Sequence, residues 1–304
     1  MSSASDLPGL RPDEAFAGFV VKRRLGQGGM GEVWLARQVS MDREVALKIL
    51  APGLAATPGF IERFTQEVRL AGKLSHPNIV TSFLAGEERG LHFLAMEFID
   101  GVGLGDRLRI DRFLPEGEAL GIGRQVAEAL AYAWNKLRML HRDIKPENII
   151  VDGGGKARLM DMGISKTADQ KLGLTMPGAM IGTPYYMSPE QARGEADIDA
   201  RSDIYSLGAT LYHLVTGQVP YDAATATAIL VKHITEPFPP PQKVNPAVSD
   251  ACASMLETMM AKKPDDRQPT WEQVIRDIDL VLAERFPATP RPSVGASQIG
   301  RAHV

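Results

Sequence analysis

The chain has 304 residues, of which 44% are hydrophobic and 23% are charged, a composition typical of a soluble globular protein and not of a disordered one. Because single hydrophobic cores stop growing at roughly 250–300 residues, this length predicts two lobes. The 34 Lys and Arg residues stand against 37 Asp and Glu residues, which gives a net charge of −3. This balance argues against a protein that binds nucleic acid through a basic surface.

The cysteine content and the lack of long apolar runs limit the compartment. Cys252 is the single cysteine of the sequence, so internal disulfides and a cysteine zinc cluster are excluded. Residues 1–9 lack the charged and apolar regions of a signal peptide, and no apolar run reaches the ~18 residues that a membrane span needs. We therefore expect a cytoplasmic protein with no membrane contact in this chain, or the cytoplasmic domain of a longer membrane-anchored protein.

Residues 19–100 predict a small lobe that is rich in strands. Short apolar or β-branched runs separated by turn residues indicate five strands, at 19–21, 32–35, 45–49, 79–84 and 91–96. Apolar residues at helical spacing in 60–71 indicate one amphipathic helix between the third and fourth strands. The pattern predicts a five-stranded antiparallel sheet with one helix, and we interpret residues 1–18 as an N-terminal extension.

Residues 101–286 predict a second lobe that is mainly α-helical. Apolar residues recur at helical spacing in three long stripes, at 122–134, 204–214 and 271–282. Residues 287–304 contain Pro, Ser, Gly and Ala without a period, which indicates a flexible tail or linker. The predicted fold class is therefore α+β, with a strand-rich lobe followed by a helix-rich one.

A glycine-rich segment lies between the first two predicted strands. Residues 26–33 (Gly-Gln-Gly-Gly-Met-Gly-Glu-Val) fit the pattern G-x-G-x-x-G-x-V, in which backbone N–H groups can approach phosphate oxygens. A dinucleotide-binding fingerprint would open a helix, whereas a strand pattern follows here. There is no Walker A motif, because neither Gly72-Lys73 nor Gly155-Lys156 is followed by Ser or Thr. A phosphate-binding hairpin and a plain glycine-rich hairpin both remain open on this segment alone.

A lysine and a glutamate follow the glycine-rich segment at places where they could meet a phosphate. Lys48 ends a Val-Ala-Leu-Lys run, and strand alternation puts its side chain on the face opposite Leu47. Glu67 lies nineteen positions later, on the predicted helix. A pair between Lys48 and Glu67 would point the lysine at phosphates instead of solvent.

Two polar segments of the second lobe carry candidate catalytic groups. Residues 141–148 (His-Arg-Asp-Ile-Lys-Pro-Glu-Asn) are mostly polar, although apolar residues flank them on both sides. Asp161, followed by Met162 and Gly163, comes thirteen residues after Asn148. Asn148 and Asp161 offer the oxygen ligands that Mg²⁺ prefers, which leaves Asp143 to act as a base.

Taken in order, these motifs resemble the signature set of protein kinases. The resemblance spans residues 19–286 and rests on the glycine loop, 45–48, Glu67, 141–148, 161–163 and Ser188-Pro189-Glu190. Residues 27–33 and 187–192 are most similar to bacterial eukaryotic-like serine/threonine kinases, and Lys145 is the Ser/Thr-type feature of that family. The resemblance implies the bilobal protein-kinase fold, with lobes at 19–100 and 101–286 and ATP between them.

The resemblance also implies a mechanism of positioning and charge neutralisation. Asp143 would orient the substrate hydroxyl and accept its proton, and Lys145 would neutralise charge on the γ-phosphoryl group. Asn148 and Asp161 would hold Mg²⁺, with Mn²⁺ as an alternative.

The ATP contacts implied by the resemblance come from the first lobe and one residue of the second. The Lys48–Glu67 pair would fix the α- and β-phosphates. Adenine would lie between Val33, Ala46 and Ile150 beside the gatekeeper Met96, with backbone hydrogen bonds to Glu97 and Ile99. The full nucleotide-binding set is Leu25, Gly26, Gln27, Gly28, Gly29, Met30, Gly31, Glu32, Val33, Ala46, Lys48, Met96, Glu97, Ile99 and Ile150.

Residues 161–190 resemble an activation segment with several hydroxyl residues. We expect autophosphorylation at Thr175, where Arg142 could pair with the phosphate. Thr183 would form part of the substrate platform. A transient homodimer would serve the autophosphorylation.

Structural anchors and departures from the family pattern are also readable. The resemblance implies a Glu190–Arg267 pair, and it implies that Asp203 supports residues 141–148, the catalytic loop. Met162 stands where the family usually has Phe, and as an apolar side chain of similar length it can fill the same pocket. Ser188 stands where Ala is usual.

The function predicted from this sequence is transfer of the ATP γ-phosphoryl group to Ser or Thr hydroxyls of protein substrates. The alternative is a pseudokinase scaffold that binds nucleotide and partners without transfer. The presence of Lys48, Asp143, Asn148 and Asp161 favours the enzyme. A small-molecule phosphotransferase is a third interpretation, which the peptide platform around Thr183 disfavours. The expected partners are ATP and protein substrates, and no nucleic acid.

Overall fold

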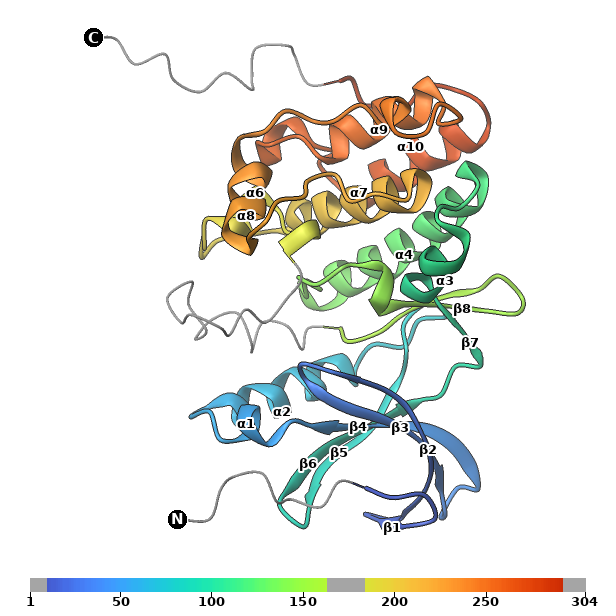
Figure 1. Ribbon diagram of the computed structural model, residues 1–304, viewed down its shortest axis with the longest axis vertical. Helices are drawn as coiled ribbons and strands as arrows, with labels where there is room; N and C mark the ends of the chain where they lie inside the picture. The colour runs from blue at the N-terminus through green and yellow to red at the C-terminus, as the bar shows by residue number, and fades with distance from the viewer. Residues whose placement is uncertain (1–9, 163–183, 292–304) are drawn as a thin grey trace. The chain divides into compact units, whose positions relative to one another are not determined.

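The computed structural model describes residues 10–162 and 184–291, which form two compact units (Figure 1). Unit 1 contains residues up to 75 together with 80–100, and unit 2 contains residues 76–79 and those from 101 onward. Unit 1 is built around a β-sheet, and unit 2 is mainly helical. The predicted α+β class with a strand-rich and a helix-rich lobe is thereby confirmed.

The sheet of unit 1 has six antiparallel strands, one more than the sequence predicts. In sheet order they are β1 (Ala15–Phe16), β2 (Phe19–Gly28), β3 (Gly31–Gln38), β4 (Arg43–Leu50), β6 (Leu91–Glu97) and β5 (Ser82–Glu88). The additional strand β1 precedes the predicted start at residue 19 and pairs with β2 through Ala15↔Val20 and Phe16↔Phe19. The prediction missed it because two residues cannot display an alternating pattern.

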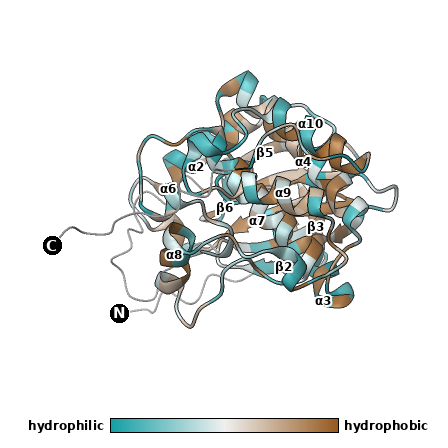
Figure 2. Cartoon of the chain, turned by 90° about the horizontal axis from the view of Figure 1, so that it is seen from above, coloured by the Kyte–Doolittle hydropathy of each residue, from teal (hydrophilic) through white to brown (hydrophobic). Residues whose placement is uncertain are grey.

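Two helices accompany this sheet, where one was predicted. The short helix α1 (Pro52–Ala55) is a single turn that begins with proline, and it is too short for apolar periodicity to reveal. The helix α2 (Phe60–Ala71) begins after Gly59, which has φ 69°, and buries Phe60, Phe64 and Val68. Figure 2 shows hydrophilic residues (teal) on α2, in keeping with a helix that buries one face only.

The two faces of the sheet carry different side chains. One face is the apolar core of unit 1, formed by Leu10, Phe16, Phe19, Val21, Trp34, Ala36, Val45, Leu47, Ile49, Leu91, Phe93 and Ala95. Alternation places Val33, Ala46, Lys48 and Met96 on the other face, where the register pairs Val33 with Lys48 and Ala46 with Met96. The prediction that Lys48 lies opposite Leu47 is confirmed.

Unit 2 is organised around a buried helix. Its helices are α3 (Leu104–Asp111), α4 (Glu116–Leu137), α6 (Pro189–Ala192), α7 (Ala200–Thr216), α8 (Ala226–Thr235), α9 (Asp250–Met259) and α10 (Trp271–Leu282). The helix α7 is buried along nearly its whole length and packs against α4 and α9, while α10 packs against α4 (Figure 1). Among the described residues, no helix combines the length and the apolar character needed to cross a membrane.

Short elements complete unit 2. A small sheet has the order β7 (Gly101–Gly103), β8 (Ile149–Asp152) and β9 (Ala157–Leu159), and β8 directly follows residues 141–148 in sequence. One-turn 3₁₀ helices occur at Pro146–Asn148, Pro184–Tyr186, Pro241–Lys243 and Pro264–Asp266.

Side-chain caps fix the starts of four helices in unit 2, whereas α3 and α4 have none. Asp199, Thr225, Ser249 and Thr270 each accept a hydrogen bond from a backbone N–H in the first turn of α7, α8, α9 and α10. Such caps satisfy donors that have no partner within the helix and typically stabilise it by ~1 kcal/mol.

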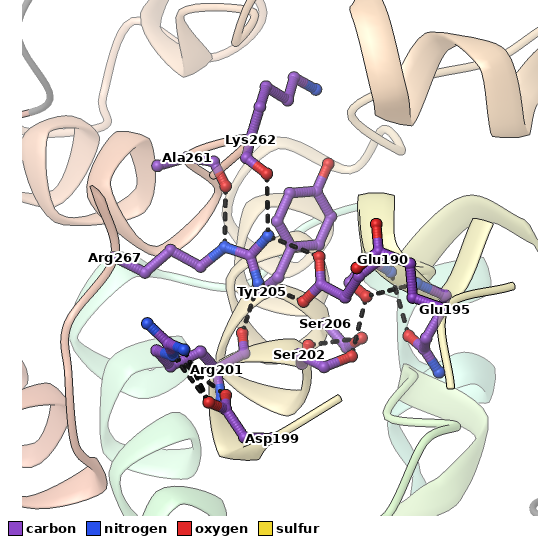
Figure 3. Close-up of polar contacts among 12 residues, drawn as sticks. Glu190, Glu195, Asp199, Arg201, Ser202, Tyr205, Ser206, Ala261, Lys262 and Arg267 are labelled. Atoms are coloured by element: carbon purple, nitrogen blue, oxygen red, sulfur yellow. Dashed lines mark hydrogen bonds and ion pairs between the residues drawn. The ribbon is translucent and has the colours of Figure 1, made fainter. Parts of the chain in front are cut away.

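A buried ion pair ties α6 to the segment before α10 (Figure 3). Two guanidinium nitrogens of Arg267 donate to the two carboxylate oxygens of Glu190, at 2.6 and 2.8 Å. The remaining donors of Arg267 reach the carbonyl oxygens of Ala261 at 2.8 Å, Arg201 at 2.7 Å and Lys262 at 3.2 Å. These distances confirm the pair that the sequence resemblance implies. Its burial is tolerated because both charged groups have hydrogen-bond partners.

Lys262 lies beside this pair with an unusual environment for a lysine. Its Nζ donates to Tyr221 Oη at 2.9 Å and to the His233 carbonyl at 2.8 Å, and lies 4.3 Å from the centre of the Tyr221 ring. Burial, together with the nearby charge of Arg267, lowers the pKa of Lys262 to about 7.

This shift predicts a stability that depends on pH through Lys262. Between pH 7 and 10.5 the unfolded chain holds a proton that the folded chain has released, so the free energy of unfolding rises with pH. We expect the wild type to gain up to ~1.4 kcal/mol per pH unit, relative to Lys262→Met, between pH 7.5 and 9.5. Urea unfolding at a series of pH values measures this slope.

The exposed neighbour Lys263 supplies the control. Lys263→Met should keep the wild-type slope. Equal slopes in the wild type and Lys262→Met would show that the ammonium of Lys262 is not destabilised by its surroundings.

Candidate active site

The glycine loop is the turn of a hairpin, as the sequence predicts. β2 ends at Gly28 and β3 begins at Gly31, with Gly28 paired to Gly31 across the turn. Gly31 has φ +131°, and a Cβ atom there would lie 1.9 Å from the Ile49 carbonyl oxygen, so a larger residue does not fit. In addition, Ala51 N–H donates to the Met30 carbonyl at 3.0 Å. The end of the loop is therefore fastened to β4.

The other loop glycines are not required by packing. Nothing lies within 4 Å of the position that a Cβ atom would take at Gly26, Gly28 or Gly29. Leu25 and Gln27 are exposed in the same stretch of β2. The lack of side chains thus leaves the backbone open to an approaching group instead of making room for a neighbour in unit 1.

Lys48 and Glu67 are buried charges of the same unit. Lys48 on β4 is 6% exposed and Glu67 on α2 is 9% exposed, and both take part in polar interactions. The Met30 sulfur lies 4.0 Å from Lys48 Nζ. Charged residues are seldom buried without a partner or a function, so their burial singles out this part of the unit.

The predicted adenine residues of unit 1 lie on the same sheet face as Lys48. Val33, Ala46 and Met96 occupy neighbouring register positions on β3, β4 and β6. Glu97 N–H donates to the Thr81 carbonyl at 2.8 Å, so a contact from Glu97 to adenine would use its own carbonyl.

Two predicted nucleotide residues lie outside this group. Ile99 follows β6, and Ile150 lies on β8 of unit 2. Ile99 therefore belongs to unit 1 and Ile150 to unit 2.

In unit 2, a buried carboxylate holds the start of the catalytic loop. Asp203 in the first turn of α7 accepts the His141 N–H at 2.7 Å and the Arg142 N–H at 2.9 Å, one with each oxygen. Arg142 has φ 68°, a conformation that these bonds help to hold. Burial raises the pKa of Asp203, and the two backbone donors and the charge of Arg142 act against that rise.

His141 is a structural residue of this loop. Its ring is fully buried, Nδ1 accepts the Asp143 N–H at 3.2 Å, and Nε2 lies 2.7 Å from the Met160 carbonyl oxygen. The acceptor role of Nδ1 places the ring proton on Nε2, which donates to Met160. His141 is therefore not available as a base.

Asp143, Lys145 and Asn148 form one connected group. Lys145 Nζ lies 2.8 Å from Asp143 Oδ2, and Asn148 Nδ2 donates to the same Oδ2 at 3.0 Å and to the Asp143 carbonyl at 2.7 Å. Within the described part of the chain, Asp143 Oδ1 receives no such bond. The carboxylate is therefore fixed through one oxygen and presents the other.

The same bonds orient Asn148. Because its nitrogen donates twice to Asp143, its amide oxygen faces away from that residue. The backbone carbonyl oxygen of Asn148 accepts the Met160 N–H at 2.9 Å. Asp161 follows Met160 directly and has φ 55°. The backbone of Asn148 is thus linked to the residue that precedes Asp161.

The side-chain oxygens of Asn148 and Asp161 suit a Mg²⁺ ion, which takes few protein ligands and completes its coordination with water and phosphate oxygens. No cluster of three or more His, Cys, Asp or Glu side chains occurs in residues 10–162 and 184–291. An all-protein metal cage is thus missing from the described chain, whereas the Asn148–Asp161 set fits a metal shared with phosphate.

The remaining predicted residues have different outcomes. Met162 is buried, as expected for an apolar side chain in the place of Phe. Thr175 and Thr183 lie outside the described residues, so their predicted roles stay predictions.

Ser188 and Gln191 have roles that the sequence interpretation missed. They form a capping box, with Gln191 N–H donating to Ser188 Oγ at 3.2 Å and Ser188 N–H donating to Gln191 Oε1 at 3.0 Å. Ser188 Oγ also lies 2.8 Å from Ser202 Oγ, and Gln191 Nε2 donates to the Arg142 carbonyl at 2.9 Å. The spacing S-x-x-Q was a readable signal for the cap, but the bond to Arg142 joins residues 49 positions apart.

Comparisons with known proteins agree with this geometry. The family model described as the protein kinase domain matches residues 19–277, and the chain belongs to that family. It is 38% identical over 260 residues to serine/threonine-protein kinase PrkC of Bacillus subtilis, covering 86% of this chain and 40% of the relative. It is 37% identical over 291 residues to serine/threonine-protein kinase pkn3 of Myxococcus xanthus, covering 92% and 53%.

Solved structures also match the chain. The crystal structure of the Mycobacterium tuberculosis PknI kinase domain aligns with a TM-score of 0.72 and 31% identity, covering 89% of this chain and 99% of that one. The chain therefore has the protein-kinase fold, although it spans only about half the length of the curated relatives.

The Asp203 contacts predict a local effect of one substitution. Asp203→Asn replaces one of the two acceptor oxygens by an NH₂ group, which would face a backbone N–H. We expect the free energy of unfolding to fall by ~2 kcal/mol, the usual cost of leaving a buried donor without an acceptor. Hydrogen exchange should accelerate at the amides of His141 and Arg142.

Asp106→Asn, at an exposed position of α3, is the control. It loses only a surface ion pair with Arg109, so it should leave both amides unchanged in exchange and lower the free energy of unfolding by at most ~1 kcal/mol. Unaltered amide exchange in Asp203→Asn would mean that Asp203 does not hold the loop.

Proposed function

We propose that this chain is a serine/threonine protein kinase that transfers the γ-phosphoryl group of ATP to hydroxyl groups of proteins. The observation that carries the proposal is the fixed carboxylate of Asp143, held through Oδ2 by Lys145 and Asn148. An acceptor oxygen in a set position is what a substrate hydroxyl needs for its proton in phosphoryl transfer. The names of the matched relatives support the same assignment.

The residues of unit 2 act at the transferred group. Asp143 Oδ1 orients the hydroxyl and takes its proton as the bond from the hydroxyl oxygen to the γ-phosphorus forms, the bond from that phosphorus to the bridging oxygen breaks, and ADP leaves. Lys145 lies close enough to Asp143 to neutralise charge on the γ-phosphoryl oxygens. Asn148 and Asp161 hold Mg²⁺, or Mn²⁺ in its place, and the metal supplies positive charge to the phosphate oxygens.

The residues of unit 1 bind the nucleotide. Backbone N–H groups of the glycine loop, between Gly26 and Gly31, approach the phosphates. Lys48 binds the α- and β-phosphates, and Glu67 keeps the lysine oriented. Val33, Ala46 and Met96 form an apolar surface for adenine, completed by Ile150, and the backbone of Glu97 and Ile99 hydrogen-bonds its edge.

Regulation and cellular context are part of the same proposal. Autophosphorylation at Thr175, in a transient homodimer, would allow Arg142 to pair with the phosphate, and Thr183 would contribute to the peptide platform. The matched relatives are about 1.9 to 2.5 times as long as the aligned region, which supports a kinase domain that belongs to a longer protein. We assign this domain to the cytoplasm, alone or as part of a membrane-anchored protein.

The proposal predicts the effect of removing the carboxylate charge. Asp143→Asn should lower kcat for phosphorylation of a protein substrate by at least ~100-fold, because general-base and positioning contributions are lost. Binding of a fluorescent ATP analogue should stay within about threefold, because the nucleotide contacts come from other residues. Transfer of radiolabelled phosphate in the presence of Mg²⁺ measures the first quantity.

Lys48→Met should instead weaken nucleotide binding, whereas Lys22→Met, at an exposed lysine paired with Glu44, should leave both quantities unchanged. Nucleotide binding without any transfer by the wild type would support the pseudokinase alternative. Full transfer by Asp143→Asn would contradict the role of Asp143.

A further inference from the structure

Met30 is the residue of the glycine loop whose side chain contacts Lys48. Its backbone position is set by the Ala51 N–H bond to its carbonyl oxygen and by Gly31, which admits no other residue. From that fixed point its sulfur reaches to 4.0 Å from Lys48 Nζ. The contact belongs to unit 1 alone and is a consequence of the hairpin geometry.

A thioether is a weak acceptor for an ammonium group, and oxidation changes that. Methionine sulfoxide carries a polar S–O oxygen, which is a far better acceptor. A sulfoxide at Met30 would accept a charge-assisted hydrogen bond from Lys48, and such bonds are about twice as strong as neutral ones. The sulfoxide oxygen would then compete with the ATP phosphates for the ammonium group of Lys48.

Accessibility separates Met30 from two of the other methionines near the predicted site. Met30 is partly exposed, as is Met160, whereas Met96 and Met162 are buried. A small oxidant therefore reaches Met30 in the folded protein more readily than it reaches those two.

We propose that Met30 is an oxidation site that regulates nucleotide binding, an inference that rests on the proposed role of Lys48. Hydrogen peroxide transfers one oxygen atom to the sulfur: a sulfur lone pair forms the S–O bond, the O–O bond breaks, and water leaves. The sulfur loses two electrons and the peroxide gains them. Methionine sulfoxide reductase reverses the change with two thiols, which become a disulfide as water is released.

Oxidation of Met30 should act on the kinetics as a competitive inhibitor of ATP does. The sulfoxide oxygen occupies the ammonium that the α- and β-phosphates require, so the KM for ATP rises. At saturating ATP the phosphates displace the oxygen, and kcat changes little because Asp143 and Lys145 are untouched.

The experiment treats the purified chain with hydrogen peroxide and quantifies oxidation of each methionine by peptide mass spectrometry. Affinity for a fluorescent ATP analogue and the KM for ATP are measured before oxidation, after it, and after treatment with methionine sulfoxide reductase. We expect a loss of affinity of about 5- to 10-fold that tracks the oxidised fraction of Met30 and is reversed by the reductase. This range corresponds to the net contribution of one typical hydrogen bond.

Two variants assign the effect to a residue, each compared with its own untreated sample. Met30→Leu removes the sulfur and should lose the response to peroxide. Met41→Leu, at an exposed methionine in the β3–β4 turn that is 65% exposed, should keep the full response. In addition, Met30→Gln places an amide oxygen near Lys48 and should weaken ATP binding without any oxidant.

The outcomes distinguish this inference from the function on which it rests. An equal loss of affinity in Met30→Leu, or complete oxidation of Met30 with unchanged affinity, would overturn the inference and leave the kinase activity standing. An untreated wild type that neither binds the ATP analogue nor transfers phosphate would overturn the proposed function itself.

Discussion

The catalytic loop depends on the buried carboxylate of Asp203. A loop with a left-handed residue, Arg142, needs an external acceptor for consecutive backbone N–H groups, and Asp203 supplies one oxygen to each. The loop can then close on itself through His141, Lys145 and Asn148. Since α7 is buried along most of its length, the carboxylate has little freedom to move. The position of Asp143 is therefore set, through the loop, by a carboxylate on the buried helix α7.

In unit 1 the candidate residues lie on a β-sheet, so strand alternation and register determine their placement. Alternation alone assigns Lys48 to the face opposite the core, and antiparallel register aligns Val33, Ala46 and Met96 beside it. Once one face of the sheet is buried in the apolar core, these four side chains must lie together on the other face. A shift of register by one residue would bury Lys48 in the apolar core.

The sequence was most informative where a pattern extends over many residues or where several motifs occur in order. The strands, the long helices, the hairpin at the glycine loop and the Glu190–Arg267 pair could be predicted in this way. Short elements could not: β1 and α1 are too short to show a period, although β1 adds Phe16 to the core. Contacts such as Gln191 with Arg142 were also out of reach, because they join distant residues through tertiary packing and leave no local signal.

The glycine loop shows why a motif can be recognised without its parts being understood. Gly31 is required by the fold, since its φ and the Ile49 carbonyl exclude any Cβ atom. Gly26, Gly28 and Gly29 meet no such obstacle in the structure, so their small size needs another reason, and close approach of phosphate supplies one. Sequence alone cannot separate these two kinds of glycine, because both appear as the same letter at the expected spacing. The distinction matters for Met30, because the structural glycine beside it fixes the backbone from which the sulfur reaches Lys48.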